Sequence, residues 1–375
     1  MNKLSKTKWV FLLPIVLAVV CITLQVPGED QRPVSDELEP VREAYDLILE
    51  KYYEPESLDK EAIIQGAIEG MVDQLPDEYN AVYSKEEYDE YLKRQEGNYT
   101  GIGMEIEKSG DRVRVVSVFP DTPASRNGLT SGDVILEVDE NSTEDMTYRE
   151  VFDALEGEQG STLRVTVKHP SGREEKIRLT RAEIKITPVE LNLLEEEKIA
   201  LIDINLFNKQ TAKELQKVLN RVENEELTGY VLDLRNNSGG WLSSAINVAS
   251  QFVDSGLITK TVGQDGVREY ESRGNSNPNL PLAVLINDGT ASASELVAGA
   301  ISDQEMGILL GRKSFGKGLV QTTHTVGQGI RVKISSSEYL TPEGNKLDQK
   351  GLTPDIKSEE WEEDLTRALE WIKEN

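Results

Sequence analysis

The chain has 375 residues, which predicts two or three domains, and its 38% hydrophobic and 29% charged residues are typical of a soluble globular body. The formal net charge of −26 argues against nucleic acid as a partner, because phosphate binding needs clustered lysine and arginine. The single cysteine, Cys21, excludes an internal disulfide, and with only His169 and His324 present a multi-histidine metal centre is excluded as well. Any catalysis must therefore use lysine or carboxylates, and the chemistry expected from the motifs below implies no metal and no cofactor.

An uncharged, apolar stretch occupies residues 9–26, and lysines at positions 3, 6 and 8 precede it. This arrangement is typical of a signal peptide or of an uncleaved signal anchor, with the body of the chain outside the cytoplasm. No A-x-A cleavage site follows the apolar run, so we favour a single-pass signal anchor in residues 1–28. Secretion after signal cleavage is the alternative.

Residues 29–97 are interpreted as a polar linker followed by a helical segment. The linker carries two prolines, and apolar residues then recur at three- and four-residue spacing as far as residue 92. Nothing in this segment suggests chemistry. Together with the amphipathic helix predicted at the C-terminus, it makes a homodimer plausible.

Residues 98–183 alternate short predicted strands with turns and contain one amphipathic helix at 148–155. The string GIGM at 101–104, the pattern P-A-x-x-x-G-L at 123–129 and G-D-x-I-L at 132–136 together resemble a PDZ domain. PDZ domains bind a C-terminal peptide as an added strand and hold its carboxylate with backbone N–H groups of the glycine-containing loop. The resemblance assigns that loop to four residues: Gly101, Ile102, Gly103 and Met104.

Residues 184–375 alternate strands and helices, which predicts α/β layering with a mostly parallel sheet. One predicted strand ends in the turn Asp-Leu-Arg-Asn-Asn-Ser-Gly-Gly at 233–240. Residues 254–279 are polar and predict a hairpin or a loop region. An amphipathic helix closes the chain.

A second apolar strand, residues 282–286, is followed by small residues and then by a predicted helix at 295–301. Ser292 lies at the start of that helix. Backbone N–H groups at such a position point at incoming negative charge, and small neighbours let a substrate backbone approach. The position therefore suits a nucleophilic hydroxyl, and Ser294 is the rival nucleophile.

Lys317 lies between two glycines, shortly after a third apolar strand at 308–310. A buried lysine loses its proton near neutral pH and can act as the general base for a serine. Lys313 is the rival base. Asp288 and Glu295 could form an acid–base pair, but nothing else supports a glycosidase, and Glu295 is interpreted as a local structural acceptor.

Four strings in order, GTASASE, FGKGLVQ, YLTPEG and KGLTPDI, resemble the carboxyl-terminal processing peptidases, also called tail-specific proteases. The resemblance extends from about residue 40 to about residue 356. It implies that Ser292 is the nucleophile, that Lys317 is the general base at the family's separation, and that Gln321 orients the lysine. It also implies an oxyanion site formed by the N–H of Ala293 and that of Gly239 or Gly240.

The resemblance implies an α/β (α+β multidomain) fold with a ClpP/crotonase-like α/β protease core, an inserted PDZ domain and a helical N-terminal segment. It further implies a membrane-anchored, extracytoplasmic serine endopeptidase that recognises polypeptide substrates by their C-termini. Envelope protein turnover, processing of precursor tails and sporulation signalling are the roles that it suggests. A catalytically inactive PDZ scaffold of the cell envelope is the alternative.

Overall fold

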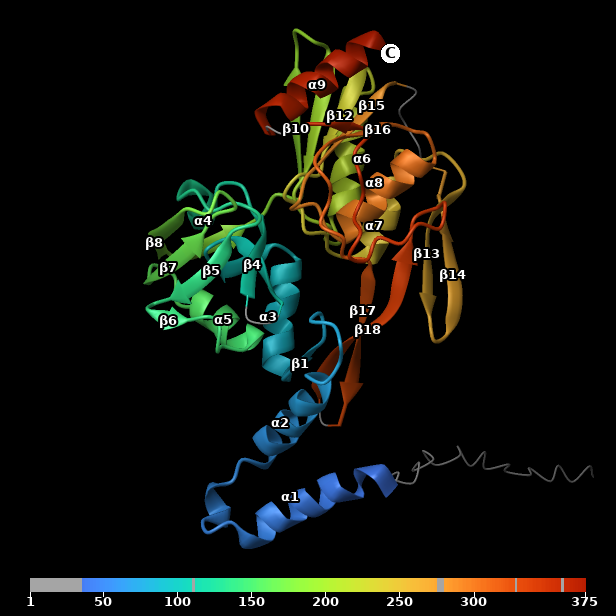
Figure 1. Ribbon diagram of the computed structural model, residues 1–375. Helices are drawn as coiled ribbons and strands as arrows, with labels where there is room; N and C mark the ends of the chain where they lie inside the picture. The colour runs from blue at the N-terminus through green and yellow to red at the C-terminus, as the bar shows by residue number, and fades with distance from the viewer. Residues whose placement is uncertain (1–35, 110–111, 275–279, 328, 359–360) are drawn as a thin grey trace, which may run out of the picture. The chain divides into compact units, whose positions relative to one another are not determined.

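The computed structural model describes residues 36–109, 112–274, 280–327, 329–358 and 361–375 (Figure 1). The chain forms two compact units, residues 1–60 and 61–375. The described part of the first unit contains the short 3-10 turns Asp36–Leu38 and Pro55–Ser57 and helix α1 (Glu39–Lys51), of which no residue is buried. The signal anchor predicted at 9–26 lies outside the described residues. Within them, every helix is too short or too polar to cross a membrane.

The elements of the second unit are as follows. The helices are α2 (Lys60–Val72), α3 (Lys85–Gln95), α4 (Pro123–Arg126), α5 (Tyr148–Leu155), α6 (Thr211–Val222), α7 (Leu242–Ala249), α8 (Ala293–Asp303) and α9 (Trp361–Glu374). The strands as far as residue 185 are β1 (Ala81–Tyr83), β2 (Asn98–Gly101), β3 (Met104–Ser109), β4 (Arg112–Val118), β5 (Val134–Val138), β6 (Asn141–Ser142), β7 (Thr162–Lys168), β8 (Glu174–Thr180) and β9 (Ala182–Lys185). The later strands are β10 (Val189–Leu194), β11 (Ile199–Ile204), β12 (Gly229–Asp233), β13 (Leu257–Gly263), β14 (Gly266–Glu271), β15 (Leu282–Ile286), β16 (Ile308–Gly311), β17 (Leu319–Val326), β18 (Ile330–Leu340) and β19 (Ile356–Lys357).

The PDZ-like segment is built on an antiparallel sheet with strand order β3-β4-β5-β7-β8, and β6 pairs with β5. Alternate residues of these strands are buried and form their own hydrophobic core, for example Val113, Val115 and Val165. Helix α5 begins with a capping box, in which the Thr147 side chain and the Glu150 side chain each bond the other residue's backbone N–H.

The main sheet has the order β10-β11-β12-β15-β16-β19, and every pair in it is parallel except β10 with β11. The central strands β12 and β15 are buried, and helices cover both faces of the sheet (Figure 1). Val284 packs in the cluster that includes α6, α7 and α8, whereas Leu285 packs with Ala368 of α9 on the other face. This explains why β15 is apolar at every position. The predicted α/β core with a mostly parallel sheet is confirmed.

A second sheet has the order β1-β18-β13-β14, and β17 pairs with β18 in a long hairpin (Figure 1). Strands β13 and β14 come from the polar region that predicted a hairpin or a loop, and β13 pairs with β18 as well. Helix α3 begins at a capping box formed by Ser84 and Glu87. The predicted N-terminal helical segment is thus α1 to α3, with the short strand β1 between α2 and α3.

Candidate active site

Ser292 lies where the buried strand β15 passes through a turn into α8, and its backbone has φ 54° and ψ −116°. A non-glycine residue rarely adopts a positive φ, and such strain is concentrated at functional sites. Ser292 and its neighbour Ala293 line a cleft of about 570 Å³, whose other walls come from α3, α7, β14, β17 and β18. The turn therefore presents the serine to a space that is large enough for part of a peptide.

The Glu295 carboxylate, one turn into α8, is fully buried and accepts hydrogen bonds from two segments of the chain. One oxygen accepts from the backbone N–H of Ser292 at 2.9 Å and from that of Lys317 at 2.9 Å. The other accepts from the Ser314 hydroxyl at 2.6 Å and from the Gly316 N–H at 2.8 Å. Glu295 is thus the local acceptor that the sequence analysis expected, and it joins the serine turn to the lysine loop.

The Lys317 side chain is partly buried, and its ammonium lies 4.5 Å from the centre of the Tyr79 ring. Burial lowers the pKa of Lys317 from its ordinary value, and the positive charge of Lys333 lowers it further. Glu105, Glu107 and Glu295 act in the opposite direction. The lowered pKa favours the neutral amine, which is the form that can accept a proton.

Gly239 and Gly240 both have positive φ, 109° and 139°, and they differ in what their N–H groups do. The Gly239 N–H donates to the Asn237 side chain at 2.9 Å. A Cβ atom on Gly239 would lie 2.8 Å from the Ala293 nitrogen, so glycine keeps the space in front of that N–H open. Within the described part of the chain, the N–H groups of Gly240 and Ala293 donate to no other group, and both residues line the cleft.

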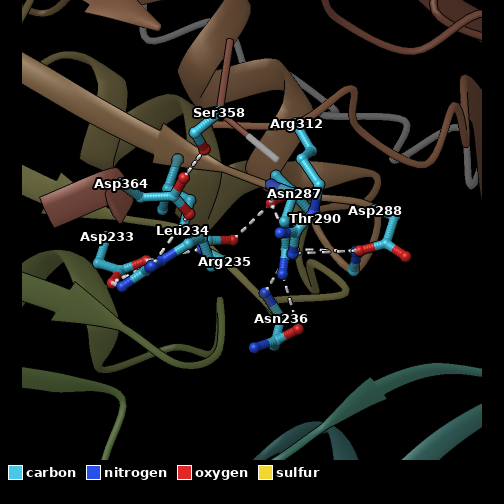
Figure 2. A network of polar contacts seen from close by, with 11 residues as sticks. Asp233, Leu234, Arg235, Asn236, Asn287, Asp288, Thr290, Arg312, Ser358 and Asp364 are labelled. Atoms are coloured by element: carbon cyan, nitrogen blue, oxygen red, sulfur yellow. Dashed lines mark hydrogen bonds and ion pairs between the residues drawn. The ribbon is translucent and has the colours of Figure 1, made fainter. Parts of the chain in front are cut away.

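A network of polar contacts joins the turn after β12 to the turn after β15 (Figure 2). Asn236 and Asn287 bond reciprocally: the Asn236 N–H donates to the Asn287 side chain at 2.9 Å, and the Asn287 amide donates back at 2.9 Å. The Thr290 hydroxyl donates to the Leu234 carbonyl at 2.8 Å. Arg235 binds Asp233 and, at 3.1 Å, Asp364 of α9. These bonds therefore fix the turn that contains Gly239 and Gly240 relative to the turn that contains Ser292.

The rival residues occupy different surroundings. The Ser294 hydroxyl is fully buried and donates to the Asn237 carbonyl at 2.8 Å, so it does not face the cleft. Lys313 is exposed. Gln321 lines the cleft, and its amide nitrogen donates to the Leu319 carbonyl and to the Ser335 hydroxyl, at 3.2 Å and 3.1 Å.

Two further residues at this site, Tyr339 and Lys333, were not predicted from the sequence. The Tyr339 hydroxyl donates to the Lys317 carbonyl and also interacts with the Ser292 hydroxyl, and the residue is 3% exposed. Its string, YLTPEG, was noted, but nothing in a single sequence indicates a contact between residues so far apart. Lys333 lines the cleft from β18, and no motif in the sequence marks it.

In the PDZ-like segment, the loop at 101–104 joins β2 to β3. Gly103 has φ 82°, and a Cβ atom there would lie 2.2 Å from Cβ of Thr122, so only glycine fits. Its carbonyl accepts from the Phe119 N–H at 3.0 Å, and the Ile102 carbonyl accepts from the Ala124 N–H at 2.8 Å. Within the described residues, the N–H groups of Ile102 and Gly103 have no acceptor.

The arrangement can support acyl transfer: a strained serine at a helix start, a lysine of lowered pKa nearby, and N–H donors that face the same cleft. Among the described residues, no cluster of histidine, cysteine, aspartate or glutamate could hold a metal ion.

Comparison with known proteins agrees with this chemistry. Residues 198–358 match peptidase family S41, residues 100–181 match the PDZ domain, and residues 22–87 match the N-terminal domain of the activating protease CtpB. A CtpA-like serine protease of Staphylococcus haemolyticus is 31% identical over 372 residues, covering 95% of this chain and 74% of that protein. A CtpA-like serine protease of Staphylococcus aureus is 32% identical over 346 residues, covering 91% and 68%.

Among solved structures, the photosystem II D1 C-terminal processing protease is similar with a TM-score of 0.74 and 30% identity, over 90% of this chain and 97% of that one. The chain therefore belongs to peptidase family S41, as a CtpA-like C-terminal processing serine peptidase that carries a PDZ domain.

Proposed function

We propose that this peptidase uses Ser292 as its nucleophile and Lys317 as its general base, and that it recognises polypeptide substrates by their C-termini. The observation that carries the assignment is the Glu295 carboxylate, which bonds the backbone N–H of both residues at 2.9 Å. The strained φ of Ser292 and its exposure to the cleft support its role, as the lowered pKa supports that of Lys317.

The proposed reaction begins when neutral Lys317 takes the proton of the Ser292 hydroxyl and the serine oxygen attacks the scissile carbonyl. The backbone N–H groups of Gly240 and Ala293 stabilise the tetrahedral anion, and Gly239 provides the space for it. Protonated Lys317 then gives its proton to the leaving amine, and water releases the acyl-enzyme. Gln321, four residues after the lysine, orients its amine when substrate is bound.

Delivery of substrate is proposed to begin at the PDZ loop. The substrate's terminal carboxylate binds the free N–H groups of Ile102 and Gly103, in the loop formed by residues 101–104. In the described residues, the Ser292 and Lys317 side chains are not hydrogen-bonded to each other, whereas Ser292 interacts with Tyr339. We infer from this arrangement that the dyad becomes aligned only after a peptide binds.

The test compares wild type with Ser292→Ala and Lys317→Ala on an unfolded protein substrate that has an apolar C-terminus. Matched controls are Ser294→Ala and Lys313→Ala. The first control removes a buried hydroxyl, but the Asn237 carbonyl still accepts from the Ala291 N–H at 3.0 Å. Cleavage should disappear in Ser292→Ala and Lys317→Ala and persist in the two control variants. Gels and mass spectrometry of the products follow the cleavage.

Loss of cleavage in Ser294→Ala alone would identify Ser294, and not Ser292, as the nucleophile. A wild type that cleaves nothing, even with a C-terminal peptide as activator, would favour the inactive PDZ scaffold of the cell envelope.

We propose four segments with different roles. Residues 1–28 anchor the chain, residues 29–97 form the linker and the helical segment, residues 98–183 recognise the peptide, and residues 184–375 carry out catalysis. The uncharged stretch at 9–26, preceded by lysines, supports a single-pass anchor with the catalytic body outside the cytoplasm. Membrane fractionation of full-length protein, with N-terminal sequencing, tests this. A soluble product that begins after residue 26 would instead identify a cleaved signal peptide.

A homodimer formed through the N-terminal helices is also proposed. Its support is the large apolar side chains that α1 exposes, such as Leu47 at 57% and Ile48 at 40%. Sedimentation of the full chain in detergent, compared with a Leu47→Glu variant, measures the expected change from dimer to monomer.

A further inference from the structure

The described residues that line the cleft in front of Ser292 are uncharged, with one exception. Among the described residues that line it, Lys333 alone carries a formal charge. A single ammonium in an otherwise uncharged cleft needs an explanation, because bringing a charge out of bulk water is unfavourable unless it is paired.

Lys333 belongs to β18, which pairs with both β17 and β1. It lies opposite Thr323 of β17 on one side and opposite Ala81 of β1 on the other. Its ammonium is 5.1 Å from the centre of the Tyr91 ring and 5.8 Å from that of Tyr83, both close enough for cation–π attraction. These rings hold the amine at the cleft and do not neutralise its charge.

No carboxylate of the described chain lies within 4.0 Å of the Lys333 ammonium, although Glu105 and Asp77 act on it from farther away. Other lysines differ: Lys346 pairs with Glu338 at 2.7 Å, and Lys260 pairs with Glu269 at 3.0 Å. Burial lowers the pKa of Lys333 to about 8, so the amine remains mostly protonated at neutral pH. The cleft thus contains a cation that is charged, partly desolvated and without a directly bound anion.

We propose that Lys333 is a specificity-determining residue whose ammonium binds a carboxylate of the peptide that occupies the cleft. The inference rests on the proposed function, because it takes this cleft to hold the segment being cut. The carboxylate has two possible sources, an acidic side chain beside the scissile bond or the free C-terminus of a short substrate. Pairing in a partly desolvated cleft is stronger than pairing at an open surface.

A different role for Lys333 predicts a different result. Its positive charge lowers the pKa of Lys317, so Lys333 also tunes the proposed base. Loss of that tuning changes the cleavage of acidic and neutral substrates by the same factor. The ratio of the two rates therefore isolates recognition of the carboxylate.

The test uses full-length protein and pairs of peptides derived from one parent sequence. The two members of a pair differ at one position beside the scissile bond, which is glutamate in one and glutamine in the other, and each flanking position has its own pair. A further pair of short peptides has a free or an amidated C-terminus. In one of these pairs, either a glutamate–glutamine pair or the pair that differs at the C-terminus, wild type should cleave the negatively charged peptide with a kcat/KM about tenfold higher than its neutral counterpart. Salt at about 0.15 M screens the enzyme's distant charges and leaves this local preference.

In Lys333→Met the ratio should fall to about one, whereas Lys333→Arg should keep it. Arg331→Met is the matched control, because Arg331 precedes Lys333 on the same face of β18, contacts Tyr88 and does not line the cleft. The same ratios, measured as Kd on the Ser292→Ala background, require no cleavage and therefore separate this inference from the proposed dyad. A wild-type ratio near one in every pair, or a ratio that Lys333→Met leaves intact, overturns it.

Discussion

The Glu295 carboxylate accepts a hydrogen bond from the backbone N–H of Lys317 at 2.9 Å, with the same oxygen that accepts from Ser292. One buried atom thus sets the distance between two loops that follow different strands, β15 and β16. Because both donors are backbone groups, the carboxylate positions the chain itself and does not bind the Ser292 hydroxyl or the Lys317 amine. Glu295 is a positioning residue in this sense.

Glu295→Gln should lower kcat/KM by about hundredfold and the free energy of unfolding by about 2 kcal/mol. Whichever way the glutamine amide is oriented, its NH2 group faces a backbone donor, either Gly316 or the Ser292 and Lys317 pair. Peptide cleavage and chemical denaturation measure the two effects. Asp303→Asn, at the other end of α8, is the control and should change neither. Full activity in Glu295→Gln would refute the positioning role.

Tyr339→Phe should lower kcat by about tenfold and change KM little, because the ring remains in its buried site while its hydroxyl leaves the Lys317 carbonyl. Steady-state kinetics with a saturating peptide gives the two constants separately. Tyr230→Phe removes the same atom from a buried tyrosine of β12 and should leave both constants unchanged. A Tyr339→Phe enzyme with wild-type kcat would show that the hydroxyl plays no part in the reaction.

Local sequence predicts the strands and turns of the candidate site, because strand and helix periodicity depends on neighbouring residues. The choice of Ser292 over Ser294, and the role of the turn with Gly239 and Gly240, came from the resemblance to the carboxyl-terminal processing peptidases and stay predictions. The sequence left open which of the two glycines donates to the oxyanion, and the proposal of Gly240 rests on the bond from the Gly239 N–H to the Asn237 side chain. Lys333 could not be predicted, because a lysine in a strand looks the same whether it faces water or a cleft.

Activity should rise with pH, because the proposed base must be neutral. Burial and the charge of Lys333 lower the pKa of Lys317, so the rising limb of kcat/KM should have its midpoint below the 10.5 of an ordinary lysine. Lys333→Met removes the repulsion and should move that midpoint to higher pH. Rates between about pH 6 and about pH 10 measure it. An unchanged midpoint in Lys333→Met would contradict the coupling of the two lysines.

Asp203 of β11 lies opposite Asp233 of β12 in the parallel sheet. Burial, and next the charge of Asp233, raises the pKa of Asp203 from 3.8 to about 6, although Asn192 and Arg235 act in the opposite direction. A raised carboxyl pKa favours the folded state only while the group is protonated. Its contribution is therefore fully present below about pH 3.8 and is lost as the pH rises through about 6.

Asp203→Asn should accordingly stabilise the protein at about pH 8, by about 1 kcal/mol after solvent screening, and should have no such effect near pH 3.8. Thermal unfolding of both proteins across this range measures the difference. Glu271→Gln, which removes the same negative charge from an exposed position of β14, is the control for the effect of net charge. A difference between Asp203→Asn and wild type that is equal at both ends of the range would mean that the substitution acts through packing, because only a titrating carboxyl makes the gain depend on pH.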